Sequence, residues 1–68
     1  MTLPDERYRA VLETREFLFA LLSPKKTPRV PYVIRLGASR CLRHYPAPTD
    51  MESAARQAPM VWGRVVDD

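Results

Sequence analysis

The sequence has one cysteine and one histidine, and these low counts exclude most of the devices that stabilise short chains. A single cysteine excludes an internal disulfide, and a single histidine disfavours a closed zinc site. A chain of 68 residues has room for one domain, and it buries only about 60% of the surface that its unfolded form exposes. We therefore expect one small domain with a net stability of roughly 3 to 5 kcal/mol, and self-association is the remaining means of increasing it.

Long apolar runs are also missing. The most apolar stretch is FLFALL at 17–22, which is too short to span a bilayer. The first residues, MTLPDERYR, are charged from position 5 onward and lead into no apolar run of the kind found in secretory signals. We therefore expect a soluble cytoplasmic protein that has no membrane partner, and a lone thiol fits a reducing compartment.

Glycine is scarce, since only Gly37 and Gly63 occur. The chain consequently has no glycine-rich loop that could cradle a phosphate, and it has no GxSxG or HExxH motif. These absences predict a protein that is not an enzyme, with no catalytic residues, no cofactor, no metal and no small-molecule substrate.

The stretch CLRHYPAPTD at 41–50 contains the two residue types that still suggest chemistry. A histidine near a thiol can activate it as a nucleophile, and Cys41 with His44 could also ligate a metal if Asp50 or Glu52 contributed. Cys41, however, falls on the apolar stripe of a predicted helix, and His44 falls in its last turn, where the helix dipole favours a cation. We favour a buried core cysteine and a helix-terminal histidine over a reactive pair or a metal site.

Carboxylates are absent from 23–48, whereas 1–22 and 49–68 each have more acidic than basic side chains. The cations of this basic block are Lys25, Lys26, Arg29, Arg35, Arg40 and Arg43. Such an asymmetry is typical of contact with an anionic surface, and nucleic acid is the candidate. The alternative is a solvated helix face, or pairing with the acidic residues at the two ends of the chain.

Prolines and apolar periodicity predict an all-α fold. A first helix is expected at about 4–22, with Thr2 as its N-cap and Pro4 in its first turn. Its apolar stripe follows helical spacing. The residues of this stripe are Tyr8, Val11, Leu12, Arg15, Leu18, Phe19 and Leu22.

A stiff, proline-rich basic connector at 23–31 should lead to a second helix at about 31–44, packed antiparallel on the first. The predicted inner stripe of this helix contains Ile34, Gly37, Ala38, Cys41, Leu42 and Tyr45. Glycine costs about 1 kcal/mol in a helix interior, so we expect another helix to approach closely at Gly37 and Ala38. Arg35, Ser39 and Arg43 should form an outer cationic face.

A short third helix is expected at about 50–58, with Thr49 and Glu52 as a capping box. The tail at 59–68 is too apolar for a solvated end, with Met60, Val61, Trp62, Val65 and Val66. We expect Trp62 to dock on the core, because an indole buries a large apolar area.

Phe17 and Leu21 lie beside the main stripe of the first helix, so a second apolar face is predicted there. These two residues and Trp62 are either core or an interface with a protein partner or a second copy. We therefore predict a non-enzymatic interaction or regulatory module that binds through Phe17, Leu21 and Trp62. The alternative is a nucleic-acid binder that uses the basic block.

ERYRAVLETREFL at 6–18 and LRHYP at 42–46 resemble the two signatures of a family of short, uncharacterised proteobacterial proteins. The likeness continues through DMESAARQAPMVWG at 50–63 and so covers nearly the whole chain. The resemblance implies a free-standing bacterial small protein. It transfers no activity and no functional residues.

Overall fold

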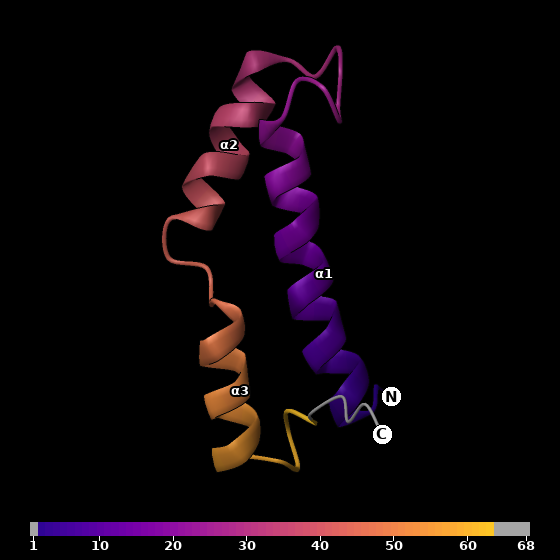
Figure 1. The fold of residues 1–68 in the computed structure, drawn as a ribbon, viewed down its shortest axis with the longest axis vertical. Coiled ribbons are helices and arrows are strands. Elements are labelled where there is room, and N and C mark those ends of the chain that lie inside the picture. Colours follow the sequence, from indigo (N-terminus) through magenta and orange to yellow (C-terminus); the bar gives the residue numbers. More distant parts are fainter. Residues whose placement is uncertain (1, 64–68) are drawn as a thin grey trace. The chain divides into compact units, whose positions relative to one another are not determined.

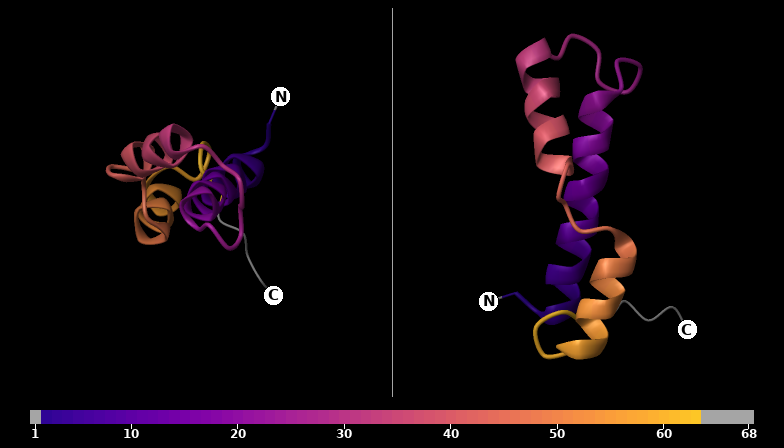
Figure 2. Two further views of the ribbon diagram at one scale, coloured as in Figure 1. Left: turned by 90° about the horizontal axis from the view of Figure 1, so that it is seen from above. Right: turned by 90° about the vertical axis from the view of Figure 1, so that its left-hand side faces the viewer.

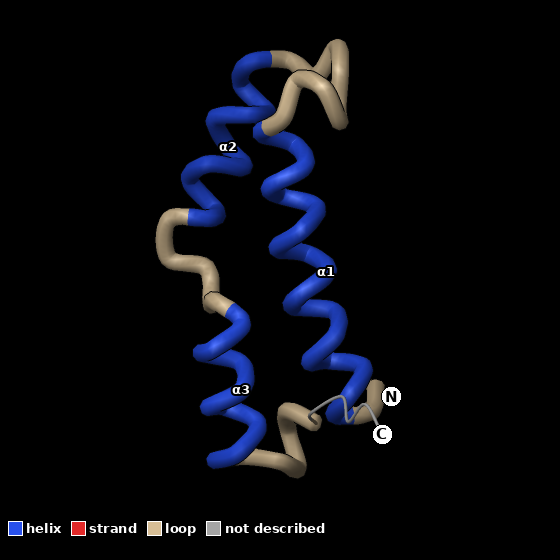
Figure 3. Tube along the Cα trace, in the orientation of Figure 1, coloured by secondary structure: helices blue, strands red, loops and turns tan. Residues whose placement is uncertain are grey.

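Three helices make up the regular structure of residues 2–63. The computed structural model describes residues 2–63, in which α1 spans Pro4–Leu22, α2 spans Tyr32–Leu42 and α3 spans Pro48–Gln57 (Figure 1). All remaining described residues are loops and turns, without a strand (Figure 3). The all-α prediction is confirmed. The first helix has its predicted bounds, the second ends two residues before the predicted position 44, and the third begins two residues before position 50.

The chain divides into two compact units, and α1 contributes to both. The terminal unit consists of the described parts of Met1–Glu13 and Pro46–Asp68, and the central unit is Thr14–Tyr45. Within the central unit the connector leaves the end of α1 and returns to the start of α2 (Figure 2). The antiparallel packing of the first two helices stays a prediction.

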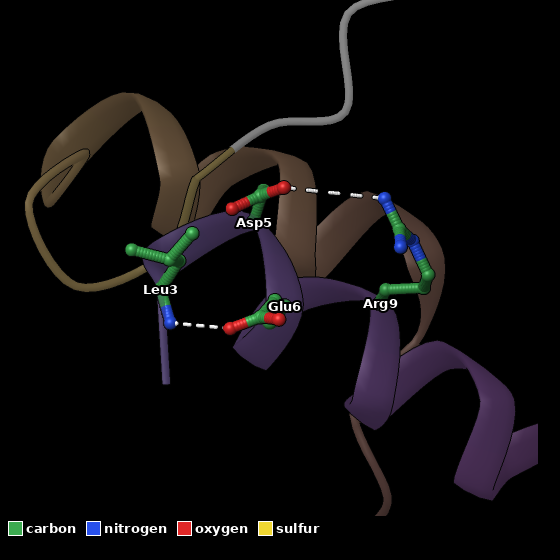
Figure 4. Close-up of polar contacts among 4 residues, drawn as sticks. All are labelled: Leu3, Asp5, Glu6 and Arg9. Atoms are coloured by element: carbon green, nitrogen blue, oxygen red, sulfur yellow. Dashed lines mark hydrogen bonds and ion pairs between the residues drawn. The ribbon is translucent and has the colours of Figure 1, made fainter. Parts of the chain in front are cut away.

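The first turn of α1 is closed by its own side chains (Figure 4). The Leu3 carbonyl oxygen accepts the first helical hydrogen bond from the Arg7 N–H, and the Leu3 N–H donates to the Glu6 carboxylate at 2.8 Å. Leu3 is therefore the N-cap, and the prediction of Thr2 was wrong by one residue. Asp5 and Arg9 approach to 4.0 Å, a spacing of four residues at which opposite charges support a helix.

A small apolar cluster forms the core of the terminal unit. Tyr8 of α1 is buried with Met51 and Ala55 of α3. Val11, Leu12 and Trp62 pack against these three side chains and remain partly buried. The prediction that Trp62 docks on the core is confirmed, and its indole is the largest side chain of the cluster.

Arg7 connects the two ends of the terminal unit. Its Nη1 donates to the Val61 carbonyl oxygen at 2.8 Å, and its Nη2 donates to the Thr2 carbonyl oxygen at 2.9 Å. Its Nε donates to the Thr2 hydroxyl at 3.2 Å. One planar guanidinium thus binds segments more than fifty positions apart in the sequence, which its fork of donors allows.

The start of α3 is set by proline and aspartate. Pro48 is the first helical residue, where its missing N–H leaves no bond unmade, and Ala47 is the N-cap. The Ala47 N–H donates to the Asp50 carboxylate at 2.9 Å. The predicted capping box of Thr49 and Glu52 was therefore wrong, because the proline places the helix start two residues earlier.

The tail contacts the first turn of α1 through glycine. A Cβ at Gly63 would lie 2.6 Å from the Asp5 backbone nitrogen and 2.9 Å from the Pro4 carbonyl carbon. Met60 and Val61 of the same tail are exposed, and Val65 and Val66 lie outside the described residues. The two backbones meet at Gly63 because it has no side chain.

Gly37 has the opposite environment. No atom of the described chain outside its own helical turn and neighbours lies within 4 Å of a Cβ built there. The predicted close approach of another helix at this position was wrong. Of the two positions predicted for the close approach, Gly37 and Ala38, only Ala38 is buried.

These two glycines give a matched pair of substitutions. Gly63→Ala should lower the free energy of unfolding by about 1 to 3 kcal/mol, since backbone atoms must move to admit the methyl group. Gly37→Ala should raise it by up to about 1 kcal/mol through helix propensity. Urea unfolding followed by circular dichroism measures both. Equal midpoints for the two variants would contradict the contact at Gly63.

Candidate interaction surface

Arg35 of α2 holds the end of α1 and the connector together. The last turn of α1 contains no basic residue that could satisfy its carbonyl oxygens. Arg35 Nη1 donates to the Leu21 carbonyl oxygen at 2.6 Å, and its Nη2 donates to the Thr27 carbonyl oxygen at 2.6 Å. A cation at this position is also favoured by the helix dipole. Arg35 therefore supplies from α2 the cap that α1 lacks.

Thr27 completes this arrangement from the connector. Its hydroxyl lies 2.8 Å from the Ala20 carbonyl oxygen and 2.9 Å from the Ser23 carbonyl oxygen, and it accepts a bond from Arg35 Nη1 at 3.2 Å. The Thr27 N–H donates to the Ser23 carbonyl oxygen at 3.0 Å. The proline-rich connector is thus fixed on the helix end by side-chain hydrogen bonds as well as by the stiffness of proline.

This use of Arg35 changes the face that α2 turns inward. Arg35 and Leu42 are half-buried, Ala38 between them is buried, and the three follow the spacing of one helical face. Ile34 and Cys41, predicted for the inner stripe, are exposed. That prediction was wrong because an arginine takes an inner position in order to reach the carbonyl oxygens of α1 and the connector.

Substitution of Arg35 should destabilise the central unit. Arg35→Lys retains the charge but loses the fork that reaches two carbonyl oxygens at once, so we expect a loss of about 1 to 3 kcal/mol in the free energy of unfolding. Arg43→Lys makes the same change at an exposed position of the same segment and should stay within about 0.5 kcal/mol of the parent. Chemical denaturation of both variants measures the difference. Similar losses in the two would contradict the capping role.

Cys41 and His44 both lie at the surface. The interpretation of Cys41 as a buried core residue was therefore wrong, and the correction follows from the inward position of Arg35 described above. The described residues hold no group of three or more histidine, cysteine or carboxylate side chains that could bind a metal ion.

An exposed thiol should react in the folded protein. We expect a disulfide reagent such as 5,5′-dithiobis(2-nitrobenzoate) to modify Cys41 at a rate within about tenfold of the unfolded chain at the same pH. Absorbance at the thiolate product band follows the reaction, with a short unfolded peptide around Cys41 as the reference. A native rate slower by several orders of magnitude would restore the buried interpretation.

The structure divides the cations of the basic block into two groups. Arg35 is committed to the backbone contacts described above. The other five are exposed, namely Lys25, Lys26, Arg29, Arg40 and Arg43. Arg29 follows Pro28 and has a φ of 64°. A positive φ is typical of the second central residue of a type II turn, in which proline is often the first central residue. The exposed basic surface is thus built from the connector and the second half of α2.

The predicted apolar interface residues fall in different units. Phe17 is 62% exposed and Leu21 is half-buried, both in the central unit, whereas Trp62 packs on the core of the terminal unit. Of the three, only Phe17 is a largely exposed side chain. Trp62 is better described as part of a core than as a contact surface.

Sequence reasoning missed a larger apolar surface at the start of α2. Tyr32 is 77% exposed and Val33 is 67% exposed, and Ile34 and Leu36 are also exposed. The signal was present, because three successive apolar residues in a helix point in directions about 100° apart and cannot all face one core. Arg35 occupies the inner position among them, which leaves these apolar side chains in solvent.

The outer face of α2 joins the two kinds of exposed residue. Val33, Leu36, Arg40 and Arg43 follow one another at intervals of three and four residues, so they lie along one face of the helical segment. We call this the outer face of α2. It is apolar in its first two turns and cationic towards its end.

The described residues contain no pocket that could enclose a small molecule. Residues 2–63 also contain no helix that is long and apolar enough to cross a membrane. Within residues 2–63, the outer face of α2 is a surface that combines exposed apolar and exposed cationic side chains.

Comparison of the chain with family models, curated proteins and solved structures finds no match. The resemblance to short proteobacterial proteins therefore stays a prediction, carried by the residues at 6–18, 42–46 and 50–63.

Proposed function

We propose that this protein is a small, non-enzymatic interaction module that binds a protein partner, or a second copy of itself, through the apolar surface of its central unit. The observation that carries this proposal is the exposure of Tyr32 and Val33 in the first turn of α2. Exposed apolar side chains that gather on one element mark contact sites, whereas isolated ones need no explanation.

The composition of this surface supports a protein partner. Tyrosine and phenylalanine are enriched at the centres of protein interfaces because a rigid ring buries much area at little cost in entropy. Tyr32 belongs to the central unit, as does Phe17 on α1. Phe17 therefore stays in the proposed interface. The α2 residues described above replace Leu21, which is half-buried, and Trp62, which packs on the core of the terminal unit.

A nucleic-acid ligand is the second candidate, and the five exposed cations favour it. They come from the connector and α2 without a carboxylate among them, since Glu16 is the single acidic residue of Thr14–Tyr45. Lysine and arginine in such a group bind phosphates with little sequence preference. The two candidates use different side chains of the central unit, so an experiment can separate them.

Affinity capture from the source cell tests both candidates. The tagged chain is compared with Tyr32→Ser/Val33→Ser, with Ser39→Ala on the same helix as a control. We expect the double variant to lose about tenfold or more of the captured partner, because truncation of an interface anchor costs about 2 kcal/mol. The control should capture as the parent does.

A nuclease-treated sample accompanies each capture. Complexes that resist nuclease and depend on Tyr32 and Val33 support the protein-binding function. Complexes that disappear with nuclease and persist in the Tyr32→Ser/Val33→Ser variant support the nucleic-acid candidate and overturn the first. Each variant is first compared with the parent by far-ultraviolet circular dichroism, so that loss of capture is not loss of helix.

A further inference from the structure

The two units of this chain have opposite charge. The central unit, Thr14–Tyr45, contains one carboxylate and seven lysine and arginine side chains. The described part of the terminal unit contains five carboxylates and three arginines. Exposed positions carry this difference, with Arg40 and Arg43 in the central unit and Glu6 and Glu13 in the terminal unit.

Each unit also exposes apolar side chains. In the central unit they begin the outer face of α2, as described above. In the terminal unit Leu3 is 59% exposed and Met60 is 85% exposed, and Val61 is exposed as well. The Arg7 guanidinium binds the carbonyl oxygens of Thr2 and Val61, so it brings the segments that contain these apolar residues to one place. We call Leu3, Met60 and Val61 the terminal patch.

We propose that the outer face of α2 binds the terminal unit of a second copy of this chain, with its apolar part on the terminal patch and its arginines near the exposed carboxylates. This inference rests on the proposed function and names the partner. The argument is complementarity, because a cationic surface with apolar residues meets an acidic surface with apolar residues. Opposite charge orients the encounter and rejects the like-charged pairing of two central units.

Because every copy carries both surfaces, two contacts can form in one pair. If copy one binds its partner's terminal unit, the partner can bind the terminal unit of copy one through an equivalent contact, and the assembly closes as a dimer. Closure doubles the buried apolar area without adding a new kind of surface. It also supplies stability that a chain with so small a core lacks.

Sedimentation equilibrium of the purified chain tests the proposal. The monomer has a mass of 7.8 kDa, and we expect the average mass to rise towards twice that value with concentration. The association should weaken between about 50 mM and about 500 mM salt, since exposed charges are then screened. A mass that stays at the monomer value at low salt over the whole concentration range would overturn the proposal.

Charge reversal tests which surfaces are used. Arg40→Glu/Arg43→Glu should raise the Kd for self-association by about tenfold or more, because like charges then face each other. Lys25→Glu/Lys26→Glu makes the same change in net charge on the connector, outside the outer face of α2, and should have a much smaller effect. If the two double variants raise the Kd equally, self-association depends only on net charge. That result would overturn the assignment of the contact to the outer face of α2.

A mixing experiment tests the terminal unit. Glu13→Lys alters an exposed carboxylate and leaves Glu6 and Asp50, which close helix ends, in place. Alone, this variant should associate less than the parent. Mixed with Arg40→Glu/Arg43→Glu it should form a heterodimer in greater amount than either variant forms a homodimer, because both contacts of the mixed pair then join opposite charges. Absence of any gain on mixing would overturn the pairing of α2 with the terminal unit.

The outcomes also separate this inference from the proposed function. If the chain is monomeric by sedimentation but captures a partner through Tyr32 and Val33, the proposed function stands and the proposal of self-association is overturned. If the chain dimerises as described but captures partners independently of Tyr32 and Val33, the proposal of self-association stands. The binding of other proteins through the apolar surface of α2 is then overturned.

Discussion

Hydrogen bonds from two arginines to backbone carbonyl oxygens are the interactions on which the rest of this structure depends. Only four of residues 2–63 are buried, and two of them are alanines, so apolar packing alone defines little. Arg7 ties the tail to the start of α1 in the terminal unit, and Arg35 ties the connector to the end of α1 in the central unit. Each guanidinium reaches two carbonyl oxygens because its donors form a rigid fork, and bonds with a charged partner are stronger than neutral ones.

This solution determines what remains at the surface. An arginine at the inner position of α2 satisfies the polar end of α1, but it leaves Tyr32, Val33 and Leu36 in solvent. A larger chain would cover these side chains with another element, whereas a chain of this size has few elements and buries a smaller fraction of its surface. Exposed apolar residues and exposed cations therefore occur together on α2, and the connector adds further exposed cations. That combination is the reason to regard the central unit as a contact surface.

Local features of the sequence were sufficient to predict the helices. Pro4 and Pro24 bracket α1, and the three-four spacing between Tyr8 and Leu22 matches its length. The docking of Trp62 followed from its size. The start of α3 was misjudged because Thr49 with Glu52 and Pro48 with Asp50 give competing signals, and proline at the first helical position decided between them. These are effects of neighbouring residues, which a sequence displays directly.

The contact surface depended on information that the sequence does not display. Periodicity favoured Ile34 and Cys41 for the inner face of α2, but that argument treats arginine as an outer residue. Only the tertiary structure shows that the end of α1 lacks a cation and that Arg35 reaches it from fourteen positions away. Likewise, the sequence favoured Gly37 as the site of close approach, and the path of the tail gives that role to Gly63. By itself the sequence determined the helices, their proline boundaries and the charge asymmetry, because these follow from local sterics and composition. The tertiary structure decided which face of α2 turns inward, because that depends on unsatisfied carbonyl oxygens in a distant part of the chain.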